Sequence, residues 1–277
     1  MLNVRFNIKS TIYAFLRNLI FTGMALSAHS SMVQSAELTL DITSYTYREV
    51  DTNDNFFMED KSAPFLYSVG IRDWGGREAT TITKSTAWSF LYTLEYSFGN
   101  VDYTSVGTGT MKKEYYKGRV EYYLSNNFGG ANDLKSYIGL GYRYLLDDSG
   151  FKKSSTNHLG YDRLSQYNYI PIGAIWYINE NFSLKSQYNY FIEGKQISYL
   201  NEILPNVYPT NIEKTQRIGY GIDLTLRSRL NNKWSTYGFF RYWKIDDSDL
   251  VSCSPTTLCM EPKNQTHEIG VGISYNF

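Results

Sequence analysis

Side chains that could take part in catalysis occur at only a few points of the sequence. General acid–base chemistry needs an imidazole or a carboxylate held beside a partner that sets its protonation. The candidates are two acidic clusters and two histidines: Asp147-Asp148, Asp246-Asp247-Ser-Asp249, His158 and His267. His267 with Asp246 or Asp247 is the one pair that neighbouring predicted segments could bring together.

Catalytic sequence motifs do not accompany these residues. The chain has no Gly-x-Ser-x-Gly, no His-Glu-x-x-His, no phosphate-binding loop and no dinucleotide fingerprint. His267 also shares the parity of Phe277, which places it on the outward face of the last predicted strand. We therefore predict a protein that is not an enzyme, with no catalytic residue, no cofactor and no metal. A lipid-modifying surface hydrolase built on His267 is one alternative in which the protein is an enzyme.

The elements that would position these residues are strands. Segments of about ten residues alternate apolar with polar or small residues, and turn residues separate them, which is the pattern of a barrel or sandwich. We predict an all-β, antiparallel, up-and-down transmembrane β-barrel of ten strands, within a range of 8–12. The strands lie near 37–48, 64–75, 86–98, 114–125, 135–147, 165–178, 181–197, 214–230, 234–246 and 265–277.

The connections alternate between long and short. The longer set is 49–63, 99–113, 148–164, 198–213 and 247–264; the connections 126–133, 179–180 and 231–233 are shorter, and 76–85 is less regular. Long outer loops and short periplasmic turns produce this alternation in outer-membrane barrels. Pro171 falls within a predicted strand, where it has no N–H for the ladder, so we expect a bulge or a hydrated position there.

The polar faces of the predicted strands carry charges of both signs. In a transmembrane barrel these faces point into the lumen, and the apolar faces, rich in Tyr and Trp, meet lipid. The predicted lumen charges are Arg72, Glu95, Lys117, Arg119, Glu121, Arg143, Lys185, Glu193, Arg217, Asp223, Arg227, Arg229, Arg241 and Glu268. Two interpretations stay open: a plug of salt bridges across the lumen, or a narrow passage that favours anions because basic residues are in excess.

The N-terminal 36 residues have the pattern of a secretory signal. Basic residues Arg5, Lys9 and Arg17 precede an apolar run from Leu19 to Ala28, and cleavage is expected after Ser35 or Ala36. Residues 1–36 are therefore the predicted signal peptide and 37–277 the barrel. The leader holds three basic residues and no acidic one, so the remainder has 24 Lys+Arg against 27 Asp+Glu, which argues against a nucleic-acid partner. Export to an oxidising compartment predicts a local disulfide between Cys253 and Cys259.

The last ten residues determine the predicted class. Apolar residues occupy every second position up to an aromatic C-terminus: Ile269, Val271, Ile273, Tyr275 and Phe277. This segment resembles the C-terminal β-signal of Gram-negative outer-membrane β-barrel proteins. The resemblance implies that the barrel-assembly machinery reads this strand, which then closes the barrel against the first strand. It also implies an outer-membrane location.

The ten-stranded layout resembles the omptin family of surface proteases. In that family the implied site pairs two aspartates with an Asp–His couple at the barrel mouth. The matching loop here, Asn201 to Glu213, contains neither His nor Asp, so no catalytic residue is carried over. We predict a non-enzymatic cell-envelope barrel whose surface loops serve structural, adhesive or ligand-binding roles. A porin-like narrow solute channel is the main alternative, and an omptin-like hydrolase a further one. The expected partners are outer-membrane lipid and lipopolysaccharide, and the expected state is a monomer.

Overall fold

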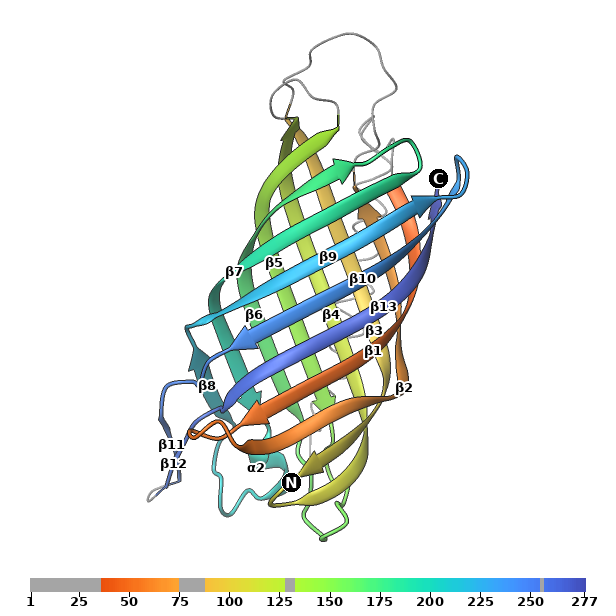
Figure 1. Ribbon diagram of the computed structural model, residues 1–277. Helices are drawn as coiled ribbons and strands as arrows, with labels where there is room; N and C mark the ends of the chain where they lie inside the picture. Colours follow the sequence, from red (N-terminus) through yellow and green to blue (C-terminus); the bar gives the residue numbers. More distant parts are fainter. Residues whose placement is uncertain (1–35, 75–87, 128–132, 255–256) are drawn as a thin grey trace, which may run out of the picture.

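All strands of the described residues except those of one short hairpin form a single antiparallel sheet that closes on itself (Figure 1). The computed structural model describes residues 36–74, 88–127, 133–254 and 257–277. The barrel strands are β1 (Ala36–Val50), β2 (Phe56–Asp73), β3 (Ser89–Ser105), β4 (Gly109–Asn127), β5 (Leu134–Asp148), β6 (Arg163–Tyr177), β7 (Phe182–Ser198), β8 (Ile212–Gln216), β9 (Gly219–Arg229), β10 (Trp234–Ile245) and β13 (Lys263–Asn276). Since β8 and β9 follow one another along the same edge of β7, they form one barrel strand. The predicted ten-stranded barrel is thus confirmed.

Closure joins the first strand to the last. β1 pairs with β13 from Glu37 opposite Asn276 to Val50 opposite Lys263, and each other barrel strand pairs with its neighbours in the chain. This up-and-down order puts residues 36 and 277 at the same end, which we call the terminal end. The opposite end, which carries residues 51–55, 106–108, 149–162, 199–211 and 246–262, is the loop end. A closed sheet leaves no edge strand with unpaired backbone groups.

Two connections expected to be long loops are mostly strand. The prediction of loops at 49–63 and 99–113 was wrong, because β2 begins at Phe56, and β3 and β4 run on to Ser105 and from Gly109. Outward-facing side chains at this end are polar, for example Arg48, Lys61 and Asp102. The apolar alternation that marks a strand therefore stops before the strand does.

The other two segments at the loop end contain short elements of their own. Residues 198–213 include the helix α2 (Leu200–Ile203), and 247–264 include a hairpin of β11 (Val251–Ser254) and β12 (Thr257–Cys259). Residues 1–35 of the predicted signal peptide and the irregular connection 76–85 lie outside the described residues, whereas Ala36, the last residue of that prediction, begins β1. No helix in the described part of the chain is long and apolar enough to cross a membrane.

The irregularity expected at Pro171 is present in the ladders of β6. Toward β5, the paired positions run from Gly141–Tyr169 to Ile138–Ile172 without the two pairs between them, where Pro171 has no N–H to donate. Toward β7, the register shifts between Asn168 and Tyr169. This register shift reverses the face on which the following residues of β7, Glu193 among them, point.

Aromatic side chains fill the lumen on both sides of its middle. One buried cluster joins Tyr45, Tyr47, Tyr167, Tyr169 and Trp243 with smaller apolar residues, and a second joins Trp74, Tyr123 and Tyr137 with Leu91 and Ile175. Rings also contact each other directly, with Tyr169 and Trp243 at 4.9 Å and Tyr123 and Tyr137 at 4.9 Å between centroids. The interior of this barrel is therefore packed with side chains.

Candidate functional site

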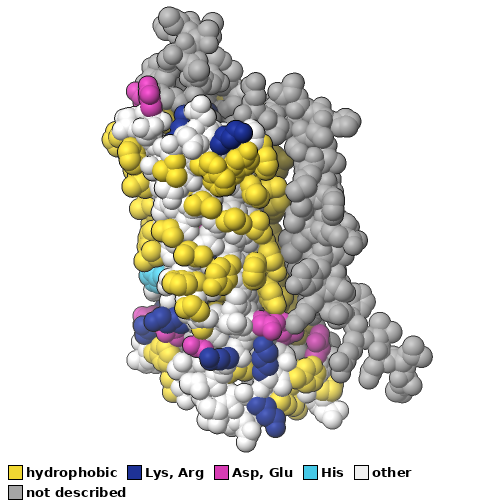
Figure 2. Space-filling model, turned by 90° about the vertical axis from the view of Figure 1, so that its right-hand side faces the viewer, with side chains coloured by type: hydrophobic (Ala, Val, Ile, Leu, Met, Phe, Trp, Pro, Cys, Tyr) yellow, Lys and Arg dark blue, Asp and Glu magenta, His cyan; other side chains and the backbone are white. Residues whose placement is uncertain are grey.

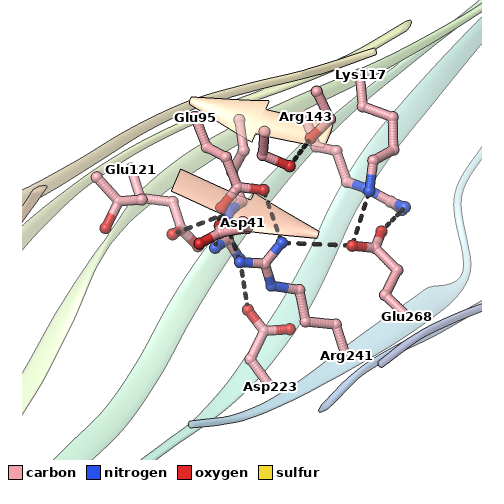
Figure 3. Close-up of polar contacts among 12 residues, drawn as sticks. Asp41, Glu95, Lys117, Glu121, Arg143, Asp223, Arg241 and Glu268 are labelled. Atoms are coloured by element: carbon pink, nitrogen blue, oxygen red, sulfur yellow. Dashed lines mark hydrogen bonds and ion pairs between the residues drawn. The ribbon is translucent and has the colours of Figure 1, made fainter. Parts of the chain in front are cut away.

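A network of ion pairs spans the lumen at its middle (Figure 3). Arg241 from β10 binds Glu95 from β3 through both guanidinium nitrogens at 2.7 Å, and reaches Glu268 from β13 at 3.3 Å. Glu268 also accepts Lys117 at 2.7 Å and Arg143 at 3.1 Å. This central network, completed by Arg119, Glu121 and Asp223, contains four carboxylates and four cations and so is balanced in charge.

Arg119 connects the remaining carboxylates of the central network. Its guanidinium lies 2.7 Å from Asp223, 3.4 Å from Glu95 and 3.5 Å from Glu121. Glu121 in turn accepts hydrogen bonds from the hydroxyls of Tyr123 and Tyr169 and from the Gln187 amide, at 2.5, 2.9 and 2.8 Å. Taking these charges out of water is costly, and their partners offset that cost, whereas a lone charge there would be uncompensated.

A second network closes the loop end. Arg163 at the start of β6 binds Glu49 and contacts Glu261 at 3.3 Å. Lys214 binds the other oxygen of Glu261 at 3.0 Å, and Lys113 bridges Asp60, at 2.9 Å, and Asp147. We call these seven residues the mouth network. Glu261 comes from the loop between β10 and β13 and is only 2% exposed, so this loop folds back and inserts a carboxylate into the mouth.

Two carboxylates of the mouth network, Glu49 and Asp60, hold protons more tightly than usual. Glu49 and Asp60 alternate with the exposed, charged Arg48 and Lys61, so they lie beyond the apolar part of the wall. Burial raises the pKa of Glu49 to about 7, with Glu261 adding to the rise and Arg163 opposing it. Burial likewise raises the pKa of Asp60 to about 6, with Asp147 adding and Lys113 opposing. The mouth is consequently sensitive to pH.

At the terminal end, three cations surround one indole ring. Arg72 lies 4.1 Å, Lys185 5.5 Å and Arg227 5.9 Å from the Trp74 centroid. Arg72 and Arg227 share Glu37, with the Arg72 contact at 3.3 Å. We call Arg72, Lys185 and Arg227 the Trp74 cation group.

The structure places most of the predicted lumen charges inside the barrel. The inward-facing residues, all buried or nearly so, are Arg72, Glu95, Lys117, Arg119, Glu121, Arg143, Lys185, Asp223, Arg227, Arg241 and Glu268. They come together in the central network and the Trp74 cation group. None lies in the mouth network, and none of the seven members of that network is among the predicted lumen charges; Asp147 alone was considered, as a candidate for catalysis.

Three of the predicted lumen residues lie on the surface instead. Glu193 follows the register shift in β7, which turns its side chain outward, and Arg217 falls in the break between β8 and β9. Their side chains are 51% and 61% exposed and pair with each other at 3.4 Å. Arg229 is the exposed last residue of β9. The prediction that these three face the lumen was wrong, because strict alternation does not continue through a bulge or past a strand end.

The basic excess that motivated an anion-favouring passage also disappears. Arg217 and Arg229 leave the lumen, and the carboxylates Glu37, Asp41, Glu49, Asp60 and Glu261 are buried within it. Glu37, Asp41 and Glu49 share the parity opposite to the apolar Leu38, Leu40 and Ile42, so the strand pattern could have revealed them. Glu261 sits in a loop, and no sequence signal points to it.

The residues considered for catalysis do not assemble into a site. His267 faces outward on β13 and its ring packs on Tyr242, 4.9 Å between centroids. His158, in the loop after β5, exchanges a hydrogen bond with Thr156 at 2.9 Å. Asp147 belongs to the mouth network, and Asp249 contacts Arg217 at 3.2 Å. No group of three or more metal-ligating side chains occurs among the described residues.

On the face that Figure 2 shows, apolar side chains cover most of the height of the outer wall and form an apolar band. Outward-facing residues of the band are exposed, as at Leu40 (50%), Leu140 (70%) and Val271 (56%), and Trp88, Trp176 and Trp234 are exposed near the terminal end. A closed sheet with an apolar exterior and a charged interior suits hydrocarbon and not water. The chain is an outer-membrane β-barrel protein. Its terminal end is thus periplasmic and its loop end extracellular.

The C-terminal strand closes the barrel, and the two cysteines form a local disulfide, both as predicted from the sequence. Ile269, Val271, Ile273 and Phe277 are exposed on the outer wall, and Tyr275 lies on the same face of β13, beside β1. That the assembly machinery reads this strand stays a prediction. Cys253 and Cys259 form a disulfide across the extracellular hairpin β11–β12, with Cα atoms 5.8 Å apart.

Comparison of the barrel with known proteins gives distant structural likenesses only. No family model and no curated protein matches the chain. Among solved structures it is similar to the outer membrane protease OmpT from Escherichia coli (11% identity, 88% of this chain and 96% of that chain, TM-score 0.46). It is also similar to an outer membrane channel from Pseudomonas putida F1 (8%, 90% and 97%, 0.41) and to Ail of Yersinia pestis (11%, 89% and 100%, 0.36). Likenesses this remote carry no argument about activity.

Proposed function

We propose that this protein is a non-enzymatic barrel whose lumen is sealed and whose role lies in its extracellular loops. The observation that carries the proposal is the central network, which joins β3, β4, β5, β9, β10 and β13 across the lumen. Aromatic clusters pack on both sides of it. Ions crossing this section would have to break several buried charge pairs at once, each of which is costly to leave uncompensated.

The loop end supports a binding role. The hairpin β11–β12 is clipped by a disulfide, and Glu261 anchors the same loop in the mouth, so this surface is held in shape. Large apolar side chains are nonetheless exposed there, with Phe151 at 63%, Leu250 at 63% and Leu258 at 65%. Exposed apolar side chains on an extracellular surface can contact a partner protein where they lie together.

The mouth supports the non-enzymatic part of the proposal. A mouth hydrolase needs a carboxylate or imidazole that both substrate and water can reach. The mouth carboxylates Glu49, Asp60, Asp147 and Glu261 are buried, and each is in contact with Arg163, Lys113 or Lys214. His267, the histidine considered for catalysis, lies on the outer wall.

We also propose that lipopolysaccharide contacts the outer wall just beyond the apolar band. Exposed basic residues face outward there on several strands: Arg48, Lys61, Lys112, Lys195 and Arg217. Figure 2 shows Lys and Arg together with acidic side chains below the apolar band. Cations at this height match the phosphate groups of the outer leaflet.

Planar-bilayer recording tests the sealed lumen. The purified barrel should give no conductance steps above background, and a large-pore porin in the same bilayer serves as the positive control. Reproducible steps that scale with salt concentration would refute the sealed lumen.

A cell-adhesion assay tests the role of the loops. Cells displaying the barrel should adhere to protein-coated surfaces, and a Phe151→Ser/Leu250→Ser/Leu258→Ser variant at equal surface level should lose this adhesion. Equal adhesion by the variant and the wild type would exclude these three side chains as the binding site.

A further inference from the structure

A small cavity lies between the central network and the periplasmic end of the lumen. Its volume is about 20 Å³, room for one or two species the size of water. Its wall holds charged and aromatic side chains and three threonine hydroxyls; the residues that matter here are Arg72, Trp74, Lys185, Thr39, Thr93 and Thr225. Two of the three members of the Trp74 cation group therefore face one cavity.

The positive charge at this cavity is incompletely balanced. Lys185 is 6% exposed, and among the described residues no carboxylate forms an ion pair with it. Its ammonium donates to the Tyr123 hydroxyl at 3.1 Å and otherwise faces the rings of Trp74, Tyr123 and Tyr137. Glu121 and Asp223 lie near enough to act on this ammonium, but neither contacts it. Cation–π contacts recover only part of the cost of burying it.

Arg72 adds a donor with no acceptor. Its guanidinium lies between the rings of Trp74 and Tyr237, at 4.1 and 3.9 Å from their centroids, and its Nε reaches Glu37 at 3.3 Å. Its Nη2 is buried and has no hydrogen-bond partner. Lys185 lies close enough for the charges of Lys185 and Arg72 to act on each other. A buried unsatisfied donor beside a second cation calls for an acceptor between them.

The acidic side chains around the cavity are already engaged. Glu95 and Asp223 also line it, but Glu95 is bound by Arg241 and Arg119, and Asp223 by Arg119. Asp41 accepts from the Tyr237 hydroxyl, and Glu37 serves both Arg72 and Arg227. None of these carboxylates contacts Lys185 or accepts a hydrogen bond from Nη2 of Arg72, so both groups can bind a ligand in the cavity.

We propose that this cavity binds one small inorganic anion of chloride size, held by Arg72 and Lys185. The cavity volume excludes larger organic anions, and the threonine hydroxyls supply further donors to a halide. This step rests on the sealed lumen proposed above: there the ion is a resident counter-charge and not a transported solute. It would bring the Trp74 cation group closer to neutrality.

Bromide locates the ion directly. Crystals of the full barrel grown or soaked in bromide should give an anomalous peak between Arg72 and Lys185. The absence of a peak there at saturating bromide would overturn the proposal, since water alone would then fill the cavity.

Unfolding measurements give an independent test. At constant ionic strength, replacing gluconate with chloride should raise the urea midpoint of the wild-type barrel, because a ligand of the folded state stabilises it. Lys185→Met should lose this chloride response, whereas Lys195→Met should keep it, since Lys195 is a surface lysine paired with Glu213. A chloride response in Lys185→Met equal to that of the wild type, or none in the wild type, would contradict the proposal. If Lys185→Met does not fold, the bromide map decides alone.

Discussion

Glu268→Gln is the most informative perturbation of the central network. The Glu268 carboxylate is 2% exposed and contacts Lys117, Arg143 and Arg241 at 2.7, 3.1 and 3.3 Å. The neutral amide keeps the shape of the side chain but leaves three buried cations with one negative charge fewer. Removing one partner of a buried ion pair costs about 3–5 kcal/mol, and the amide oxygen still accepts a hydrogen bond, so we expect a loss of about 3 kcal/mol in unfolding free energy.

The assay is urea unfolding of the barrel in detergent micelles or vesicles, followed by tryptophan fluorescence and by electrophoretic mobility. Glu193→Gln is the matched control, since Glu193 pairs with Arg217 on the surface, where an ion pair contributes about 1 kcal/mol or less. A Glu268→Gln/Lys117→Met double variant should recover part of the loss because it removes a cation together with the missing anion. The reasoning fails if Glu268→Gln is as stable as Glu193→Gln.

Three further predictions concern the mouth, the hairpin and the outer wall. The raised pKa values of Glu49 and Asp60, about 7 and 6 in the folded state, mean that the folded barrel binds more protons than the unfolded chain below these values. The free energy of unfolding should therefore fall as pH rises from about 4.5 to 7. In a pH series of urea midpoints, Glu49→Gln should show a shallower fall than the wild type. An equal slope of midpoint against pH in both proteins would exclude Glu49 as the cause. Cys253→Ser/Cys259→Ser should lower the barrel's unfolding midpoint little, because the disulfide closes a short ring. The same variant should be cleaved faster by protease within 250–260. Protease resistance equal to that of the wild type would argue that the disulfide does not hold the hairpin in shape. His267→Ala should leave folding and adhesion unchanged, and loss of any measured hydrolytic activity in that variant would count against the non-enzymatic proposal.

The sequence predicts this fold well because its strongest signals are local. Alternation of side chains along a strand has a period of two, so one apolar face and one polar face can be read wherever the strand lies in lipid. The terminal Phe277 with Tyr275 and Ile273 marks the closing strand on the same principle. Where β2 and β4 extend beyond the bilayer, the outward face carries polar residues such as Lys61 and Lys112. The apolar alternation is lost there, which explains the loops wrongly expected at 49–63 and 99–113.

The charge partners could be predicted only in part. Parity along an unbroken strand assigns Glu95 and Arg241 to the lumen, but their contact depends on the circumference and tilt of the closed barrel. Parity fails at Glu193, where a single inserted residue reverses the face. It gives nothing for Glu261, whose position follows from a loop folding back onto Arg163. Partner identity in a lumen is thus a property of the closed ring and not of any one segment.

The cross-lumen pairs also bear on how such a chain is assembled. Glu95 and Arg241 lie 146 residues apart in sequence and on opposite sides of the junction between β1 and β13. While the sheet is open, Glu95 and Arg241 lack each other on the concave face, although each keeps a partner on a neighbouring strand, Arg119 or Glu268. Full neutralisation and ring closure must therefore coincide, so an unfinished barrel is poorly suited to bare lipid and needs a hydrated or protein-lined shelter until its final strand arrives.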